Sequence, residues 1–267
     1  LLFFTNLGKV YSMPCYDLPQ DVTRSTRGLS MVNLLPITSG EKVTAIVTTE
    51  KDNKSGYIVL ATRMGEMKRM SFSALSNIRS NGLITMDLEP GDELVSAWRA
   101  QELDEIVMVT EGGMAARFPV TDLRVRSRYA GGVRGIRLEP GDKVVSMDVV
   151  LQGAQLLVIS QNGFGKLTPI QAYRRTARGA KGVRTLRITD KTGPVAAAHL
   201  VVDVNEVMLV SAKGNIIRMP LSDIPVKGRN TQGVWMMRPT GGDYVITVAS
   251  MNNYPDNKQP ESESESE

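Results

Sequence analysis

The amino-acid sequence predicts an all-β fold, a propeller-like β-pinwheel of four-stranded units that repeat along the chain. Three glycine landmarks recur in the same order with a period near 50 residues, and self-similarity at such a period is typical of propellers and solenoids. The segments between the glycines are short and β-rich, and none shows a sustained helical period. Because radial repetition protects strand edges, a closed or nearly closed propeller is favoured over a sandwich.

The three landmarks place the strands of each repeat. The first glycine lies in a tight turn after an apolar strand, the second opens a new strand, and the third precedes the last strand. The glycines of the first landmark are Gly8, Gly65, Gly113, Gly163 and Gly214; of the second, Gly28, Gly82, Gly132, Gly182 and Gly233; of the third, Gly40, Gly91, Gly141, Gly193 and Gly242. They define five visible repeats, with part of a sixth as an open possibility.

Repeat four illustrates the four predicted strands. Residues 155–160 and 165–168 flank an Asn-Gly turn of the kind that joins hairpin strands, and residues 182–188 and 195–200 follow. Alternation within the third strand is clearest in repeat three, where Arg134 lies between apolar Val133 and Ile136. Since a pleat sends successive side chains to opposite faces, apolar residues are expected in the core and arginines outside.

Charge and composition suggest two parts of unlike character. We expect a β-pinwheel domain over residues 1–254 and a disordered acidic tail over residues 255–267. The whole chain carries a net charge of +4, and its last 12 residues carry −4, so the preceding 255 carry +8. A basic body suits a polyanionic partner, for which the tail could compete. A high isoelectric point that merely favours solubility is the alternative on composition alone.

Other classes of protein are excluded or disfavoured by composition. The single cysteine, Cys15, allows no internal disulfide and no cysteine-built zinc site. No apolar run approaches the roughly 20 residues that span a bilayer, so no membrane partner is expected. Residues 1–4 are apolar without a preceding basic region, so we expect no signal peptide and a cytoplasmic, nucleoid-associated location.

Basic side chains recur in register with the repeats, at two kinds of position. In the loops before the second glycine they are Arg24, Arg27, Arg79, Arg124, Arg126, Arg128, Arg174, Arg175, Arg178, Lys181, Lys227 and Arg229. On the hairpins, and on the strand after the second glycine, they are Lys9, Lys68, Arg69, Arg117, Arg134, Lys166 and Arg218. Equivalent repeats place these residues at equivalent points around a ring, so we predict a belt of charge that tracks phosphates without reading bases. The alternative is that exposed loops are commonly charged.

Several motifs resemble one known family. They are residues 9–13, residues 26–28 with 32–36, residues 132–138 with 141–146, residues 161–166, and residues 228–234. Together they resemble the C-terminal domain of gyrase A, a component of the type IIA topoisomerase DNA gyrase, over essentially all of residues 1–254. The resemblance implies a β-pinwheel whose blades exchange strands and whose outer rim wraps duplex DNA in support of negative supercoiling.

The resemblance also implies which partners the chain has and in which parts of the enzyme catalysis takes place. Duplex DNA, the rest of gyrase A, and gyrase B are the expected partners. The ATP and magnesium of the ATP-dependent enzyme act in other parts of the holoenzyme, so we expect no catalytic residue, no metal and no cofactor in this chain.

One departure from the family leaves an alternative open. The signature heptapeptide Gln-Arg-Arg-Gly-Gly-Lys-Gly is missing, and the nearest stretch, residues 174–182, lies in the fourth visible repeat. Either the sequence begins just after the signature, within a sixth blade, or the chain comes from the related topoisomerase IV, whose corresponding domain selects DNA substrates. The signature's wrapping role does not transfer to residues 174–182 in either case.

Residues that resemble catalytic groups have simpler interpretations. The single histidine, His199, lies in an apolar strand and is expected to be structural, since no second histidine accompanies it. The pairs Glu89 with Asp92 and Glu139 with Asp142 recur in Glu-Pro-Gly-Asp turns, so turn chemistry explains them better than general acid–base catalysis.

The two tryptophans and the repeat length address the remaining alternatives. Trp98 and Trp235 lie in strands and are expected to be buried, and no aromatic ladder for single-stranded nucleic acid is present. A protein-binding propeller of the WD-repeat kind is disfavoured, because its period is about 40–45 residues. Duplex DNA is therefore the favoured partner.

Overall fold

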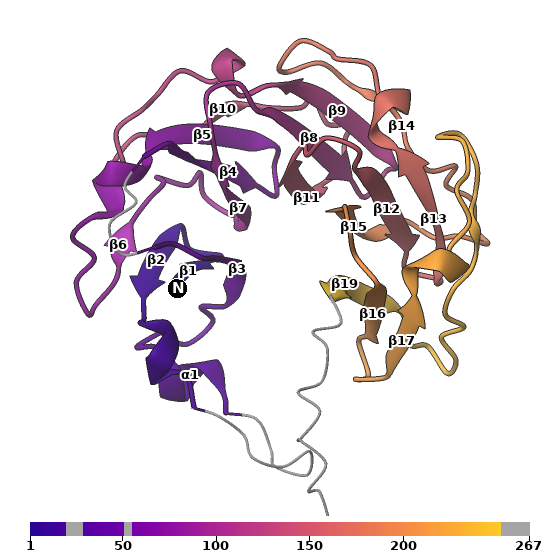
Figure 1. Ribbon diagram of the computed structural model, residues 1–267, viewed down its shortest axis with the longest axis horizontal. Helices are drawn as coiled ribbons and strands as arrows, with labels where there is room; N and C mark the ends of the chain where they lie inside the picture. Colours follow the sequence, from indigo (N-terminus) through magenta and orange to yellow (C-terminus); the bar gives the residue numbers. More distant parts are fainter. Residues whose placement is uncertain (20–28, 51–54, 252–267) are drawn as a thin grey trace, which may run out of the picture.

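Five antiparallel sheets are arranged around a central axis in the computed structural model, which describes residues 1–19, 29–50 and 55–251 (Figure 1). The all-β, propeller-like fold is confirmed. Arg24, Arg27, Gly28 and the acidic tail lie outside the described residues.

The sheets share one strand order. From the axis outward, the first is β3 (Val43–Val47), β1 (Leu2–Thr5), β2 (Lys9–Ser12) and β6 (Leu83–Ile84), and the second is β7 (Leu94–Ala100), β4 (Tyr57–Thr62), β5 (Glu66–Ser71) and β10 (Val133–Arg134). The third is β11 (Val144–Val149), β8 (Glu105–Thr110), β9 (Met114–Pro119) and β14 (Val183–Arg184). The fourth is β15 (Val195–Val201), β12 (Gln155–Ser160), β13 (Phe164–Pro169) and β18 (Val234–Trp235), and the fifth is β19 (Val245–Met251), β16 (Glu206–Ser211) and β17 (Ile216–Pro220).

The outermost strand of each four-stranded sheet comes from the following repeat. Val133 pairs with Met67 of the preceding repeat, and Val183 pairs with Ala115 in the same way. A short 3-10 helix follows the hairpin of each sheet: η1 (Cys15–Asp17), η2 (Phe72–Leu75), η3 (Val120–Asp122), η4 (Ile170–Ala172) and η5 (Leu221–Asp223). Four of them begin after a proline, which has no N–H to continue the ladder. The exchange of strands between blades is therefore confirmed, and we call β6, β10, β14 and β18 the exchanged strands.

Two predicted strands differ from the structure. The strand expected over 182–188 pairs only at Val183–Arg184, because the amides of Thr185 and Leu186 both donate to the carbonyl of Gly113. In repeat one, the expected strand after Gly28 is instead the helix α1 (Met31–Leu34). Among the described residues this segment has no preceding hairpin to pair with, and it packs on its own sheet around Phe3 and Tyr11. Correspondingly, within residues 55–251 no fourth strand pairs with β17.

Hydrophobic cores lie between consecutive sheets. In β4, Ile58 and Leu60 face the first sheet while Val59 and Ala61 face the third, and all four are fully buried. The same division holds along the arc, with further cores between the third and fourth and between the fourth and fifth sheets. The strand next to the inner one in each sheet, such as β4, is thus apolar on both faces. The exchanged strand lies at the outer edge of the sheet.

The recurrent glycines allow close approach at the hairpin turns. Gly113 has φ +75°, and a Cβ there would lie 2.7 Å from the carbonyl oxygen of Leu186. Gly163 has φ +80°, and a Cβ there would lie 1.9 Å from the carbonyl oxygen of Met237. Only glycine fits such a turn, since it lacks the Cβ and tolerates positive φ. The first landmark is therefore the point where the next repeat crosses the hairpin.

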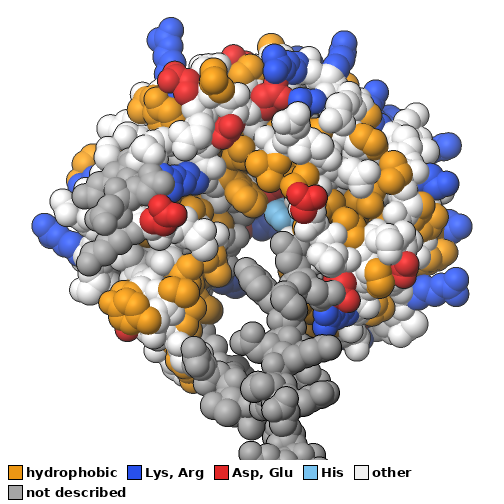
Figure 2. Space-filling model, in the orientation of Figure 1, with side chains coloured by type: hydrophobic (Ala, Val, Ile, Leu, Met, Phe, Trp, Pro, Cys, Tyr) orange, Lys and Arg blue, Asp and Glu red, His pale blue; other side chains and the backbone are white. Residues whose placement is uncertain are grey.

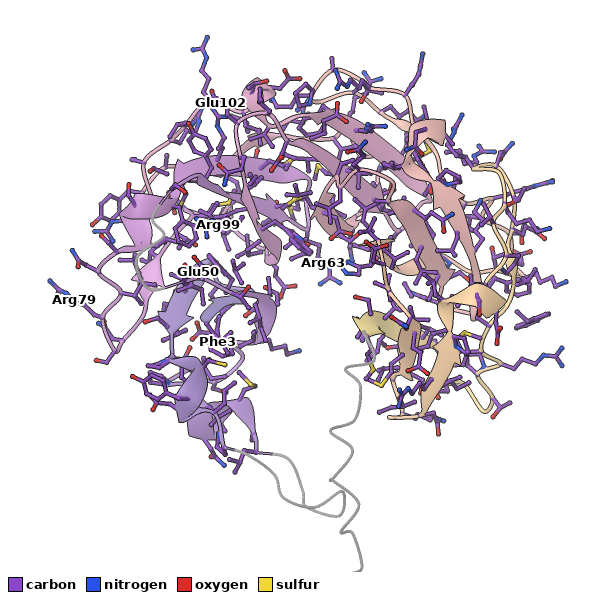
Figure 3. The ribbon with its side chains drawn as sticks, viewed as in Figure 1. Phe3, Glu50, Arg63, Arg79, Arg99 and Glu102 are labelled. Atoms are coloured by element: carbon purple, nitrogen blue, oxygen red, sulfur yellow. The ribbon has the colours of Figure 1, made fainter. Side chains whose placement is uncertain are left out.

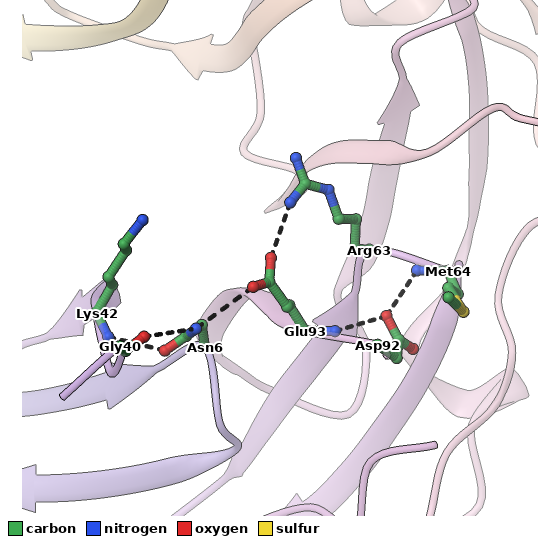
Figure 4. A network of polar contacts seen from close by, with 7 residues as sticks. All are labelled: Asn6, Gly40, Lys42, Arg63, Met64, Asp92 and Glu93. Atoms are coloured by element: carbon green, nitrogen blue, oxygen red, sulfur yellow. Dashed lines mark hydrogen bonds and ion pairs between the residues drawn. The ribbon is translucent and has the colours of Figure 1, made fainter. Parts of the chain in front are cut away.

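The acidic residues of the third landmark hold the same turns together (Figure 4). The Oδ1 atom of Asp92 accepts hydrogen bonds from the amides of Met64 and Glu93, at 2.9 and 2.8 Å. Glu93 also accepts from Arg63 at 2.8 Å and from Asn6 of the neighbouring sheet at 3.4 Å. This geometry supports the turn interpretation of the Glu-Pro-Gly-Asp segments, because the carboxylates of Asp92 and Asp142 accept from backbone amides.

Candidate nucleic-acid interface

The outer edge of the arc is built from four loops that lead into the exchanged strands. These rim loops comprise residues 76–82, 123–132, 173–182 and 224–233, and they run along the outside of the molecule (Figure 1).

Successive repeats are hydrogen-bonded along this edge. The amide of Asp87 donates to Ala130 at 3.3 Å, and that of Arg137 donates to Ala180 at 3.0 Å. One repeat further on, the amide of Arg187 donates to Thr231 at 3.1 Å. The rim is therefore a continuous surface rather than a set of separate loops.

Two arginines fasten consecutive repeats to one another. Arg178 Nη1 donates to the carbonyl oxygen of Arg134 at 2.6 Å, and its Nε donates to that of Asp122 at 3.1 Å. At the equivalent place in the next repeat, Arg229 Nη1 donates to the carbonyl oxygen of Arg184 at 3.1 Å. Both side chains keep their charge at the rim while they fix its shape.

Most predicted basic residues of the rim loops are solvent-exposed. Figure 2 shows Lys and Arg side chains projecting from the outer edge, and Figure 3 shows Arg79 pointing away from the arc while Arg63 lies at its inner side. The exposed residues of the predicted set are Arg79, Arg124, Arg126, Arg134, Arg174, Arg175, Lys181, Arg218 and Lys227, and the half-buried ones are Lys9, Arg117, Arg128, Arg178 and Arg229.

Lys68 and Lys166 do not belong to this surface, contrary to the prediction. Both are fully buried. Lys68 Nζ donates to the carbonyl oxygens of Thr85, Arg128 and Ala130, each at 2.7 Å. Lys166 Nζ donates to those of Gly228 and Arg229, each at 2.6 Å. These hairpin lysines anchor the rim loop of the next repeat from beneath.

Burial lowers the pKa of both lysines to about 8. For Lys68 the neighbouring charge of Arg126 adds to the effect of burial, while Asp87 opposes it. For Lys166 the charge of Arg229 adds to it. An ammonium taken out of water loses hydration, which disfavours its charged form.

Two hairpin arginines are also engaged within the fold. Arg69 is buried, and its guanidinium lies 4.4 Å from the centre of the Tyr57 ring. Arg117 Nε donates to Glu105 at 2.7 Å, and its Nη1 donates to the carbonyl oxygen of Ile170 at 2.9 Å. On β5 and β9 the second strand of the blade lies beneath the next rim loop, so these basic residues point into protein rather than toward solvent.

Some exposed cations of the predicted set also have acidic partners. Arg175 pairs with Glu105, Arg218 with Glu206, and Lys181 with Glu139 at 2.5 Å. The hydrogen bond and charge of Lys181 lower the pKa of the Glu139 carboxyl. The cation is exposed in each of these pairs, whereas the carboxylates of Glu105 and Glu206 are largely buried.

Three exposed arginines were missed by the focus on loop clusters. Arg184 occupies on β14 the position that Arg134 occupies on β10, and Arg137 and Arg187 follow on the same edge. The alternation that places Arg134 outside applies equally to them, so the signal was present in the sequence.

The tryptophans are more exposed than predicted. Trp98 and Trp235 expose 36% and 43% of their surface. Trp235 lies on exchanged strand β18, where the outward position faces solvent. Trp98 lies on inner strand β7 and stacks against His199, with ring centroids 5.9 Å apart. An inner strand has no further strand to cover it, so its axial face stays partly open.

His199 has a structural partner near the axis. Its Nδ1 lies 3.1 Å from an oxygen of Asp148, whose other contacts include the amide of Leu200 at 2.7 Å. Burial opposes protonation of His199, but the hydrogen bond and charge of Asp148 outweigh it and raise the histidine pKa.

The described part of the chain contains neither a cluster of metal ligands nor a membrane-spanning helix. No group of three His, Cys, Asp or Glu side chains there could hold a metal ion. Of the helices within residues 1–19, 29–50 and 55–251, none is long and apolar enough to cross a membrane.

A family model described as "DNA gyrase C-terminal domain, beta-propeller" matches the chain in five segments. The matched residues are 1–50, 56–97, 104–151, 154–201 and 205–250, one segment for each repeat. The chain belongs to the DNA gyrase C-terminal domain family. The boundaries of the five segments agree with the period seen in the glycine landmarks, so the repeats of the sequence are the blades of this family.

Curated relatives agree with this assignment. The gyrase A protein of Halalkalibacterium halodurans is 50% identical over 252 residues, which cover 94% of this chain and 30% of the relative. The gyrase A of Clostridium acetobutylicum is 39% identical over 267 residues, covering 100% and 32%, and that of Escherichia coli is 35% identical over 246 residues, covering 92% and 28%. This chain thus spans about a third of the length of these relatives.

Solved structures of this family and of topoisomerase IV share the fold. A DNA gyrase A C-terminal domain superposes with a TM-score of 0.81 at 23% identity, covering 94% of this chain and 82% of that one. A topoisomerase IV C-terminal domain gives 0.82 at 24% identity, covering 93% and 78%. The fold does not separate the two enzymes, whereas the named relatives are all gyrase A proteins and favour gyrase.

Proposed function

We propose that this chain is the DNA-wrapping domain of a gyrase A protein. The continuous basic rim is the observation that supports this function: exposed arginines recur on hydrogen-bonded rim loops and exchanged strands of successive repeats. Phosphate contacts made by such side chains carry no sequence information, so binding is expected on any duplex.

Electrostatic attraction must offset the stiffness of the duplex. Bending 20–30 bp by 40–90° costs about 1–6 kcal/mol. If roughly eight phosphates are neutralised, the logarithm of the binding constant should fall with the logarithm of salt concentration with a slope near −7. A slope shallower than about −3 would argue against wrapping by the rim.

The proposal assigns this chain a binding role within a larger enzyme. The rest of gyrase A, together with gyrase B, would supply strand cleavage and ATP hydrolysis, and the wrapped segment would be presented to them in the cytoplasm. The chain itself would contribute no catalytic group and hold no cofactor.

The triple substitution of Arg124, Arg126 and Arg128 by Ala tests the rim. We expect weaker duplex binding by gel shift on several unrelated sequences, and a salt slope shallower by about 2–3. The matched control replaces Lys42, Lys143 and Lys213 by Ala, because all three lysines are exposed and lie outside the rim loops: Lys42 and Lys143 directly precede inner strands β3 and β11, and Lys213 lies in the turn between β16 and β17. An equal loss in the control, or a loss confined to one sequence, would contradict the proposal.

Wrapping is tested separately from binding. A nicked plasmid ligated in the presence of the chain should close with a linking number displaced from that of naked DNA. Bound protein with an unchanged topoisomer distribution would leave DNA binding intact but overturn wrapping. With the complete holoenzyme, supercoiling rather than selective relaxation or decatenation would distinguish gyrase from topoisomerase IV.

A further inference from the structure

The outward positions of the four exchanged strands form a row with an unexpected composition. This row consists of Ile84 on β6, Arg134 on β10, Arg184 on β14 and Trp235 on β18. Their cross-strand partners, at one equivalent register, are Lys9, Glu66, Met114 and Phe164. The two inner members of the row are arginines, and both end members are large apolar residues that expose 49% and 43% of their surface.

Ile84 lies in a hollow of the rim that cations surround. The hollow has a volume of about 580 Å³ and is lined by Lys9, Arg79 and Arg128 together with Tyr129. Arg128 stacks on Tyr129, 4.1 Å from the centre of its ring. The apolar side chain is thus flanked by three positive charges on an open part of the rim.

Trp235 is held in a fixed orientation at the other end of the row. Its ring centroid lies 4.0 Å from that of Phe164, which is buried beneath it. The guanidinium of Arg238 lies 5.4 Å from the Trp235 ring, and the ammonium of Lys191 lies 5.3 Å from the Phe164 ring. The half-exposed indole, stacked on a buried ring and next to Arg238, is the second apolar contact that the rim offers to a polyanion.

We propose that Ile84 and Trp235 are apolar wedges that enter the duplex between base pairs and kink it at the two ends of the rim, while Arg134 and Arg184 hold phosphates between them. The inference rests on the proposed DNA-binding function. Proteins that bend DNA insert Phe, Leu, Ile or Met side chains from the minor groove, and the unstacked step lets the bent duplex contact more protein. Single exposed apolar residues are common on proteins, but these two occupy equivalent positions and both have cations beside them.

The test exchanges each wedge for the residue that its equivalents carry. I84R and W235R add positive charge to the rim, so binding of a linear duplex should be retained, with a salt slope steeper by about 1 for each. Bending should fall, measured as energy transfer between dyes on the two ends of a duplex shorter than the ~150 bp persistence length. We expect the transfer change on binding to drop by at least a third in each variant and further in the double variant.

Matched variants separate the wedge from charge and from folding. L103R adds the same charge on the turn between β7 and β8, at a leucine that is 94% exposed, and should bend DNA as the wild type does. W235F keeps an aromatic cover over Phe164 and should retain most of the bend. If W235R alters the urea transition, I84A decides the question, because Ile84 covers no buried ring.

The outcomes distinguish this inference from the function on which it rests. Wild-type bending by both I84R and W235R, at saturating protein, overturns the wedge. Absence of duplex binding by the wild-type chain overturns the proposed function itself. A loss of affinity without a change in bend would assign these residues to an ordinary rim contact and would also overturn the wedge.

Discussion

The buried lysines of the hairpins and the exposed arginines of the exchanged strands carry the same charge in opposite surroundings. Lys68 lies on β5 beneath a rim loop and donates hydrogen bonds to three backbone carbonyl oxygens. Arg134 lies on β10, which pairs with that same strand, and faces solvent. Position in the sheet, rather than charge, decides whether a cation shapes the rim or is available to a ligand.

The comparison also shows how the rim is kept in shape. Lys68 and Lys166 hold their loops from below through carbonyl dipoles, without a carboxylate hydrogen-bonded to either ammonium among the described residues. Arg229 fastens the loop that Lys166 holds, and Arg178 donates to the carbonyl oxygens of Asp122 and Arg134, which flank the loop that Lys68 holds. A surface that bends a stiff polymer must itself resist deformation, and these four cations supply that resistance.

The largest expected effect comes from removing the buried charge. Lys68→Met should lower the free energy of unfolding by about 3 kcal/mol, since three carbonyls lose their donor at roughly 1–3 kcal/mol each, while the ammonium no longer has to be desolvated. Urea unfolding followed by circular dichroism measures the difference.

Lys143→Met is the matched control, because this lysine is exposed in a turn. Its effect should stay within about 0.5 kcal/mol. A Lys68→Met chain as stable as the control would show that the rim loop does not depend on the buried ammonium.

The repeat architecture could be predicted from the sequence because it depends on local rules. The turn at Gly113 requires a glycine, and the alternation of Val133 and Arg134 follows from the pleat. Both signals recur every 50 residues or so, and repetition makes them readable. The basic rim followed from the same register.

The burial of Lys68 and Lys166 could not be predicted, because it depends on contacts between residues distant in the chain. Most of the carbonyl oxygens that bind their ammonium groups belong to the rim loop of the next repeat, some 60 residues later in the chain. They come into reach only when that loop crosses over the hairpin. The exposure of Trp235 arises in the same way, since β18 pairs with the preceding blade and leaves one face open. A strand pattern shows which residues share a face but not which face remains uncovered.

A smaller effect on stability is expected for Arg134, the exposed arginine of exchanged strand β10. Arg134→Ala should leave the free energy of unfolding within about 0.5 kcal/mol of the wild type. Duplex binding should weaken on every sequence, and the salt slope should become shallower by about 1. An unchanged salt slope would show that Arg134 does not contact DNA phosphates. A large loss of stability would show that Arg134, like Lys68, supports the fold.

His199 offers the smallest and most specific test, because its buried charge has a carboxylate partner that the lysines lack. Since Asp148 raises the histidine pKa in the folded chain, the stabilisation is fully present below the ordinary pKa of about 6.5 and is lost as the pH rises through the folded value. The stability difference between wild type and His199→Gln should therefore be larger at about pH 5.5 than at about pH 8.5. In Asp148→Asn only burial remains, which lowers the pKa, so the dependence should reverse its sign. A difference independent of pH would show that the ring acts through packing against Trp98 alone.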